Sequence, residues 1–529
     1  MNRRKFIKNG SSATAGTLIA SSLPGYIRFP ESSKESKKSK FSHRLPKSNT
    51  HYKHTCGYIE DDPVDEYSWA PDKAYEDFQD MKFGIRLHWG VYSIIQQEAS
   101  WPFISMPLTK RHAYQELYKS WNPTGFDAEE WTDFFVDSGA KMFSFTAKHH
   151  DGFSMFDTKT RVKSHANFLA PGGPKTEDCD VAYSIMETPF NRDVVKELCD
   201  AAHKKGLKID LYFSHPDWYD ADFRPYNYHP LQVPDSATLA VTGKDRSPED
   251  MEEPDERYGE SGLITVPNPD PQEVNRMMKR HRAQLEELIT RYGTIDMVCF
   301  DQWLGPTVWP QLRETLLHLR KIRPNVMYRA RGIGNYGDYY TPEGFVPGSK
   351  ENSDVPWFVI YPLAEIFAYE PRGDMYKGSK WIVHNLINSV SMGGNFMAAI
   401  GPDGNGKFHP KAIEQLRQTG AWLRINGEGI YATRAREEEL WKEGEQVRFT
   451  RSKDNKTVYA FSLEWPGSQL VLKTVKPKRR SKIYLMGNNT PLKWIYDTSK
   501  GLVIEFPSEL EFKIPKAGQL AYGFKIEVY

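Results

Sequence analysis

The chain has 529 residues, of which 39% are hydrophobic and 13% aromatic, so a single small domain, a disordered chain, a coiled coil and collagen are all excluded. The net charge of +1 is uneven, because residues 1–50 hold 11 Lys and Arg against 2 acidic residues. The other 59 basic and 67 acidic residues lie in residues 51–529, whose net charge is therefore −8. An acidic body of this kind does not favour a nucleic acid as partner.

The N-terminus carries the basic excess in a pattern typical of an export signal. Arg3-Arg4 precedes a weakly apolar stretch from Gly10 to about Leu23, which predicts a twin-arginine signal peptide over residues 1–23. This stretch is too short and too polar to span a bilayer, so no stable membrane insertion is predicted. The expected partner of the precursor is the twin-arginine export machinery, and the expected location is the periplasm or another exported site. An ordinary disordered basic tail is the alternative.

Residues 24–50 are rich in Ser and Lys and are predicted to form a disordered tether. The four cysteines, Cys56, Cys179, Cys199 and Cys299, contain no C-x-x-C pair. Neither a disulfide framework nor a cysteine metal site is therefore indicated.

From about residue 80 to residue 425, short apolar runs alternate with helical patterns, which is typical of βα units around a parallel sheet. The predicted catalytic domain spans residues 51–426. The span and the number of units predict a (β/α)8 barrel, with an open doubly wound sheet as the alternative. The predicted strands are Lys82–His88, Lys141–Ala147, Leu207–Phe213, Asp296–Asp301, Asn325–Arg329 and Gly394–Ile400, with weakly marked strands near 357–362 and 381–388.

Helical patterns fill the intervals between these strands. One predicted helix begins after Asn191 as N-cap and runs through Val194 and Ala202, and a second runs from Val274 to Tyr292. Between them, residues 219–271 are polar and rich in Pro, Asp and Glu. This segment is predicted to be a long loop insertion on the face of the barrel that holds the active site.

After residue 426 the pattern changes to short strands separated by turns. Residues 427–529 are predicted to form a C-terminal antiparallel β-sandwich. Its expected strands are Gln446–Thr450, Thr457–Leu463, Gln469–Thr474, Lys482–Met486, Leu502–Glu505 and Tyr522–Tyr529.

Polar clusters follow four of the predicted barrel strands, where barrel enzymes keep their active sites. They begin at His88, Lys148, Ser214 and Asp301. Asp301 stands out because it follows a buried-strand run, and a positioned carboxylate can act as a nucleophile. Pairing with an arginine or capping a helix is its structural alternative. A second carboxylate is needed for acid/base work, and spacing alone does not choose among Asp338, Glu343, Asp354, Glu365 and Glu370.

Several motifs in chain order resemble the α-L-fucosidases of glycoside hydrolase family 29. They are Phe83-Gly84-Ile85-Arg86-Leu87-His88-Trp89-Gly90, Lys148-His149-His150-Asp151-Gly152-Phe153, Asn191-Arg192-Asp193-Val194, Gly393-Gly394-Asn395 and Asn426-Gly427-Glu428-Gly429-Ile430-Tyr431. The resemblance runs from about residue 65 to the C-terminus. It implies a retaining exo-acting α-L-glycosidase that acts on an oligosaccharide or polysaccharide and needs no cofactor and no metal.

The resemblance also implies roles for individual residues. Asp301 stands at the nucleophile position, and Glu343, 42 residues later, is the expected acid/base, with Glu365 in reserve. The two carboxyl groups of a retaining enzyme lie about 5–5.5 Å apart, and their pKa values must differ. Residues expected to bind the sugar by hydrogen bonds or by stacking are His88, His149, His150, Arg331, Glu98, Trp101, Trp218 and Trp303.

Two departures from the family concern the pocket for the methyl group of fucose. Arg86 and Cys299 stand where large aromatic residues are common in the family. A guanidinium brings donors that a methyl group cannot satisfy, so these residues favour a sugar with a hydroxyl or charged group at C6. An exo-α-L-galactosidase acting on algal-type galactans is therefore one alternative. A non-catalytic carbohydrate-binding relative and a metal-dependent barrel hydrolase using His88, His149, His150 and Asp301 are the others.

Overall fold

The computed structural model describes residues 41, 43–45, 59–224, 226, 229–232, 266–342 and 355–529. The predicted signal peptide, most of the predicted tether and much of the 219–271 insertion lie outside the described residues. No helix among the residues described is long and apolar enough to cross a membrane.

Seven parallel strands form the central sheet, in the order β7-β6-β5-β2-β1-β9-β8. They are β1 (Phe83–Leu87), β2 (Met142–Lys148), β5 (Lys208–Ser214), β6 (Met297–Asp301), β7 (Met327–Tyr328), β8 (Phe358–Pro362) and β9 (Asn395–Ile400). Parallel bridges join Arg329 to Tyr339 and Tyr340 to Trp357. Residues 339–340 therefore lie between β7 and β8 and close the sheet into a barrel of eight segments. The predicted (β/α)8 fold is confirmed, and the open doubly wound sheet is wrong.

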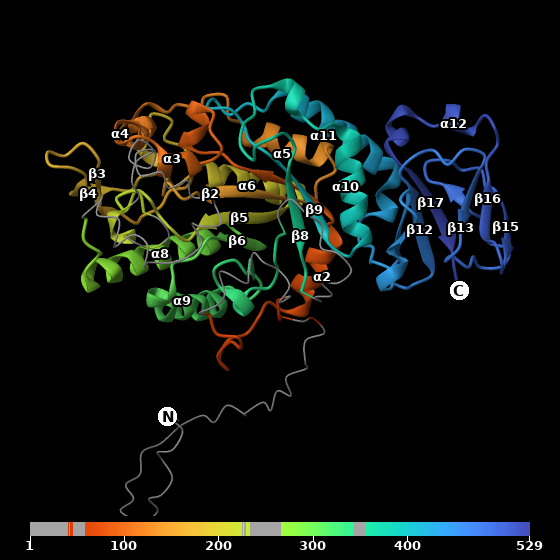
Figure 1. Ribbon diagram of the computed structural model, residues 1–529, viewed down its shortest axis with the longest axis horizontal. Helices are drawn as coiled ribbons and strands as arrows, with labels where there is room; N and C mark the ends of the chain where they lie inside the picture. Colours follow the sequence, from red (N-terminus) through yellow and green to blue (C-terminus); the bar gives the residue numbers. More distant parts are fainter. Residues whose placement is uncertain are drawn as a thin grey trace, which may run out of the picture. The chain divides into compact units, whose positions relative to one another are not determined.

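Helices surround this sheet; in Figure 1, α8 and α9 lie below the strands and α5 and α11 above them. The main helices are α2 (Asp72–Met81), α5 (Ala128–Asp137), α6 (Val194–Lys205), α8 (Pro271–Arg291), α9 (Trp309–Ile322), α10 (Ser379–Ser391) and α11 (Pro410–Asn426). Shorter elements follow β1 and β2, namely α3 (Trp101–Ser105), α4 (Leu108–Glu116) and the hairpin β3 (Val162–Asn167) and β4 (Lys175–Val181), which the sequence pattern did not predict.

Two local predictions in the barrel are wrong. The segment 381–388, predicted as a weak strand, belongs to helix α10, where Ile382, Val383 and Leu386 recur at helical spacing on the buried face. β-branched residues raised the apparent strand character of this segment. The N-cap of α6 is Asp193 rather than Asn191, because the Asp193 side chain accepts a hydrogen bond from the Lys196 amide.

The C-terminal part forms two antiparallel sheets with their own hydrophobic core. One sheet is ordered β10-β11-β12-β17-β14 and the other β13-β16-β15. Their strands are β10 (Lys442–Glu443), β11 (Val447–Arg451), β12 (Thr457–Ser462), β13 (Gln469–Leu472), β14 (Tyr484–Leu485), β15 (Lys493–Asp497), β16 (Gly501–Glu505) and β17 (Tyr522–Glu527), with helix α12 (Leu510–Lys513) before the last. The predicted β-sandwich is confirmed, although β10 and β15 were not foreseen.

The last barrel helix packs against the sandwich. The Trp422 indole in α11 donates a hydrogen bond to the Ala521 carbonyl at 2.8 Å, and Phe461 of β12 packs against the same indole. A buried aromatic contact of this kind couples the sandwich to the barrel more firmly than a flexible linker would.

Candidate active site

The site is built at the carboxyl ends of the barrel strands. Asp301 is the last residue of β6. In the sheet register Ser214 of β5 lies opposite Asp301, and Tyr212 lies opposite Cys299. His149 and His150 directly follow β2, and His88 follows β1. The fold thus brings together residues that lie more than 200 positions apart in the chain.

Asp301 is buried among hydrogen-bond donors and positive charges. Its Oδ1 accepts hydrogen bonds from Arg331 Nη1 at 2.7 Å and from the Gln302 amide at 3.0 Å, and Arg329 Nη1 lies 3.7 Å away. Its Oδ2 accepts a hydrogen bond from the Tyr212 hydroxyl at 2.6 Å. Burial alone raises the pKa of Asp301, but the guanidiniums of Arg331 and Arg329 outweigh it and hold that pKa well below its usual range. Asp301 is therefore ionised, as a nucleophile must be.

The three predicted histidines meet beside this carboxylate, and each ring is held by a hydroxyl group. His88 Nδ1 is hydrogen-bonded to Thr146 Oγ1 at 2.9 Å, His149 Nδ1 to Ser100 Oγ at 2.5 Å, and His150 Nδ1 to Ser214 Oγ. Their rings contact one another, with centroids 5.3 Å apart for His88 and His149 and 4.2 Å apart for His149 and His150.

Burial sets the protonation state of two of these rings. It lowers the pKa of His149 well below the usual value and that of His150 to about 4. Both imidazoles are therefore neutral at pH 7 and can each donate and accept a hydrogen bond, which suits the recognition of sugar hydroxyls. His150 Nε2 lies 3.7 Å from Asp301 Oδ2.

The metal-dependent alternative requires these same side chains to act as ligands. Among the described residues, no group of three or more His, Cys, Asp or Glu side chains is placed to hold a metal ion. Ser100 and Ser214 instead engage one nitrogen of His149 and of His150.

The predicted tryptophans differ in their access to the site. The Trp101 ring is half-buried and lies edge-on to His150, with centroids 4.5 Å apart. Trp218 packs on the same imidazole at 5.1 Å but is only 1% exposed, and Trp303 is buried two residues after Asp301. Trp101 therefore keeps the most surface for stacking on a sugar.

Arg86 and Cys299 also come together in the barrel interior. Arg86 Nη1 donates hydrogen bonds to Cys299 Sγ at 3.2 Å and to Ser144 Oγ at 2.8 Å, and it lies 4.0 Å from Asp210 Oδ2. Its guanidinium lies over the Tyr212 ring, 4.4 Å from the centroid. The two departures from the family pattern thus form one buried polar cluster in contact with Tyr212.

Of the downstream carboxylates, the structure describes Asp338, Glu365 and Glu370. Glu343 and Asp354 lie outside the described residues. Glu365 is exposed and paired with Arg372 at 2.8 Å, and Arg372 also holds the buried Glu370. Asp338 is buried and paired with Arg320.

Glu98, the acid expected to contact the sugar, lies in a loop that borders the histidines. It lies two positions before Ser100, the partner of His149, and its Oε2 accepts a hydrogen bond from the Phe367 amide at 2.9 Å. Burial raises the pKa of Glu98 to about 7. Phe367 in turn lies edge-on to His88, so Glu98 connects two loops that border the site.

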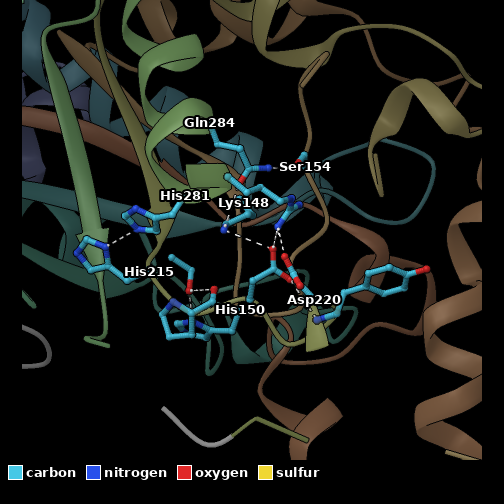
Figure 2. Close-up of polar contacts among 12 residues, drawn as sticks. Lys148, His150, Ser154, His215, Asp220, His281 and Gln284 are labelled. Atoms are coloured by element: carbon cyan, nitrogen blue, oxygen red, sulfur yellow. Dashed lines mark hydrogen bonds and ion pairs between the residues drawn. The ribbon is translucent and has the colours of Figure 1, made fainter. Parts of the chain in front are cut away.

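A network of buried charges lies next to His150, and Figure 2 shows the polar contacts around Lys148 and Asp220. Asp217 Oδ2 accepts a hydrogen bond from Arg280 Nη1 at 2.6 Å and lies 3.5 Å from Lys148 Nζ, and Asp220 lies 3.3 Å from the same guanidinium. Gly152 makes this packing possible, because a Cβ there would lie 1.9 Å from Asp217 Oδ1. The Trp218 amide then donates to the His150 carbonyl at 2.7 Å, which fixes the loop against the imidazole.

We expect Asp217→Asn to lower the free energy of unfolding by about 3 kcal/mol, because it leaves Arg280 and Lys148 buried with weaker partners. Urea unfolding at pH 7 measures the change. Asp180→Asn is the matched control, since Asp180 forms exposed ion pairs with Arg161 and Lys163 and should change stability by less than about 1 kcal/mol. Equal small losses in both variants would contradict a structural role for the buried network.

Sequence reasoning did not single out Tyr212, Arg329 or Arg280, and it placed Asp217 in the polar cluster that begins at Ser214 without giving it a role. The available signal for Tyr212 was its position two residues before Ser214, which places both side chains on one side of β5. Arg280 lies in the middle of α8, and nothing in its local pattern pointed to Asp217, 63 residues earlier.

Comparison with known proteins identifies the family. The family model for α-L-fucosidase matches residues 60–428, and that for the α-L-fucosidase C-terminal domain matches residues 442–527. Human plasma α-L-fucosidase is 27% identical over 467 residues, covering 83% of this chain and 87% of its own. Human tissue α-L-fucosidase is 27% identical over 477 residues, with coverages of 85% and 88%.

Solved structures share the fold. α-L-Fucosidase isoenzyme 1 from Paenibacillus thiaminolyticus superposes with a TM-score of 0.67 at 23% identity, covering 87% of this chain and 99% of its own. A family 29 α-L-fucosidase from Bacteroides thetaiotaomicron gives a TM-score of 0.67 at 21% identity, with coverages of 89% and 98%. Because the catalytic-domain model alone spans most of the chain, the protein belongs to the α-L-fucosidase family, glycoside hydrolase family 29, and is a glycoside hydrolase.

Proposed function

We propose that the protein is a retaining, exo-acting α-L-glycosidase that releases a terminal α-L-fucose-type sugar from an oligosaccharide or polysaccharide. The observation that carries the proposal is the buried, ionised Asp301 beside three histidines at the carboxyl ends of the barrel strands. A Bacteroides thetaiotaomicron relative of the same fold has been trapped as a covalent intermediate with 2-fluoro-fucosyl fluoride, which supports a covalent route.

In the proposed first step, an Asp301 carboxylate oxygen bonds to the anomeric carbon while the bond to the leaving oxygen breaks. Glu343 gives its proton to that oxygen. In the second step a water oxygen bonds to the anomeric carbon, Glu343 takes the water proton, and the glycosyl ester to Asp301 breaks. The neutral imidazoles of His149 and His150 would hold the sugar hydroxyls without adding charge near Asp301.

A second candidate, exo-α-L-galactosidase activity, is favoured by the Arg86 and Cys299 cluster. L-Galactose differs from L-fucose by a hydroxyl at C6, and a polar pocket wall can satisfy that hydroxyl, whereas an aromatic wall excludes it. Arg86 contacts the ring of Tyr212, whose hydroxyl donates to Asp301, so one side chain separates the polar cluster from the proposed nucleophile.

The deciding experiment compares hydrolysis of aryl α-L-fucoside and aryl α-L-galactoside by the wild-type protein, with the first-formed anomer followed by NMR. We expect the α-anomer first, from one or both substrates. A β-anomer first would contradict the double displacement, and no turnover of either would favour the carbohydrate-binding alternative. Activity abolished by a chelator and restored by zinc would favour the metal-dependent one.

The double variant Arg86→Phe with Cys299→Trp should raise the ratio of kcat/KM for fucoside over galactoside by about tenfold or more, because it replaces donors by apolar surface. Parallel kcat/KM measurements on both substrates test this. Val471→Phe, an exposed substitution on β13 of the sandwich, is the control and should leave the ratio unchanged. A ratio that does not move in the double variant would refute the assignment of these residues to C6.

We also propose export through the twin-arginine pathway, supported by Arg3-Arg4 and the apolar stretch that follows them. Replacing both arginines by lysine in the full chain should retain the precursor in the cytoplasm, as measured by fractionation.

A further inference from the structure

A buried stack of side chains reaches Asp301 from the barrel interior. The Arg86 guanidinium lies 4.4 Å from the centroid of the Tyr212 ring, and the His149 ring stacks on Tyr212 with centroids 5.4 Å apart and planes 13° apart. The Tyr212 hydroxyl donates to Asp301 Oδ2 at 2.6 Å. The ring that carries this hydroxyl is therefore restrained by contacts with both a cation and an imidazole.

The two oxygens of Asp301 have different partners. Oδ1 accepts from a guanidinium and from a backbone amide, at 2.7 and 3.0 Å. Oδ2 accepts from a neutral phenol. A charged donor withdraws more electron density than a neutral one, so Oδ2 keeps the greater nucleophilicity.

We propose, on the basis of the double displacement above, that Oδ2 is the attacking oxygen and that the Tyr212 hydroxyl assists its departure in the second step. Arg86 is a positioning residue that acts through the Tyr212 ring. Tyr212 is then a catalytic residue, because it touches a reacting atom, whereas Arg86 reaches Asp301 by way of that ring.

The direction of the effect follows from the bonding at Oδ2. When the bond from Oδ2 to the anomeric carbon forms, Oδ2 becomes an ester oxygen, which accepts hydrogen bonds poorly, and the Tyr212 contact weakens. When water attacks and that bond breaks, negative charge returns to Oδ2 and the contact strengthens. Tyr212 transfers no proton, and its hydrogen bond stabilises the leaving carboxylate as negative charge develops on it.

The surroundings keep both residues in these roles. Burial raises the pKa of Tyr212 well above its usual value, so the phenol remains a donor. Arg86 is almost fully buried and is held by Ser144, Cys299 and the charge of Asp210. Its guanidinium therefore has little freedom to leave the Tyr212 ring.

The test is Tyr212→Phe, assayed with whichever aryl glycoside the wild type hydrolyses. We expect kcat to fall by about tenfold or more while kcat/KM changes by less than about threefold, because the second step slows and the first does not. Stopped-flow assays should then show a burst of aryl alcohol, and mass spectrometry should detect the glycosyl-enzyme. Equal losses in kcat and kcat/KM, with no burst, would overturn the proposal.

Arg86→Met tests the positioning role, with Arg86→Lys as a second variant that keeps the charge. We expect Arg86→Met to lower kcat in the wild-type background. In the Tyr212→Phe background the same substitution should lower kcat by less than about a further threefold. Additive losses would show that Arg86 does not act through Tyr212. Should Arg86→Met not fold, Arg86→Lys is judged by the same criterion of non-additivity.

A matched control lies in the same barrel. Tyr328 on β7 is buried, with the Arg320 guanidinium over its ring at the same 4.4 Å, and its hydroxyl has no hydrogen-bond partner among the described residues. Tyr328→Phe should show neither the burst nor a fall in kcat that is larger than the fall in kcat/KM. Wild-type protein that hydrolyses neither glycoside would refute the proposed function itself. If the wild type is a retaining enzyme but Tyr212→Phe lowers kcat and kcat/KM equally, this inference alone is refuted.

Discussion

Asp301→Gly is expected to lower kcat/KM for an aryl α-L-glycoside by roughly 10⁴-fold, because the substitution removes the atom that bonds to the anomeric carbon. Added azide should restore part of the turnover. The variant keeps the positive charges of Arg331 and Arg329 around the space that the carboxylate occupied, and they attract a small anion. Azide attacking from that side yields a β-glycosyl azide from an α-glycoside, which NMR identifies.

Asp301→Asn is the matched control for this experiment. Its amide fills the space of the carboxylate, so azide has no room and activity should stay low. The nucleophile assignment would be refuted if Asp301→Gly kept its activity within tenfold of the wild type. It would equally be refuted if the rescue product were the α-glycosyl azide, because the anion would then have approached from the opposite side of the sugar.

The strand ends of the barrel could be predicted from the sequence because a local residue pattern marks each of them. An apolar run followed by His88, His149 or Asp301 marks both the strand and the point where it ends. Parallel strands place such ends at one face, so the pattern alone predicted that these residues would lie together. Arg331 follows β7 for the same reason, and it donates to Asp301.

The partners of these residues were harder to predict because they depend on register between distant strands. Tyr212 is paired with Cys299 in the register of β5 and β6, and only that register shows that its hydroxyl reaches Asp301. Arg86 was foreseen as a pocket residue, but its contact with the Tyr212 ring depends on side-chain direction inside a closed barrel. Local composition also gave a wrong prediction for α10, which was predicted as a strand because its valine and isoleucine residues, which lie on a buried helix face, favour strands.

Buried charges were the least predictable part of the site. Lys148 and Asp217 belong to two of the polar clusters predicted at strand ends, whereas Arg280 lies in a predicted helix and had no role assigned. The fold buries all three and pairs them, so their role emerges only from the packing of α8 against the loop after β5. Long-range ion pairs of this kind leave no periodic trace in the sequence.

Glu343→Ala is expected to separate substrates by their leaving groups. For glycosides with a sugar or alkyl leaving group, kcat/KM should fall by about 10³-fold, because that oxygen needs a proton as it departs. For activated aryl glycosides the fall should stay within about tenfold, because a nitrophenolate leaves without protonation. The basic limb of the pH profile of kcat/KM should also disappear, since that limb reports ionisation of the acid.

Glu365→Ala is the matched control, and it also tests the reserve assignment. Glu365 is exposed, and its carboxylate forms an ion pair with Arg372 at 2.8 Å on the protein surface. We expect its variant to keep wild-type activity on both classes of substrate. If instead Glu365→Ala showed the leaving-group dependence and Glu343→Ala did not, the acid role would pass to Glu365. The segment after β8 would then have to bring that carboxylate to the leaving oxygen when substrate binds.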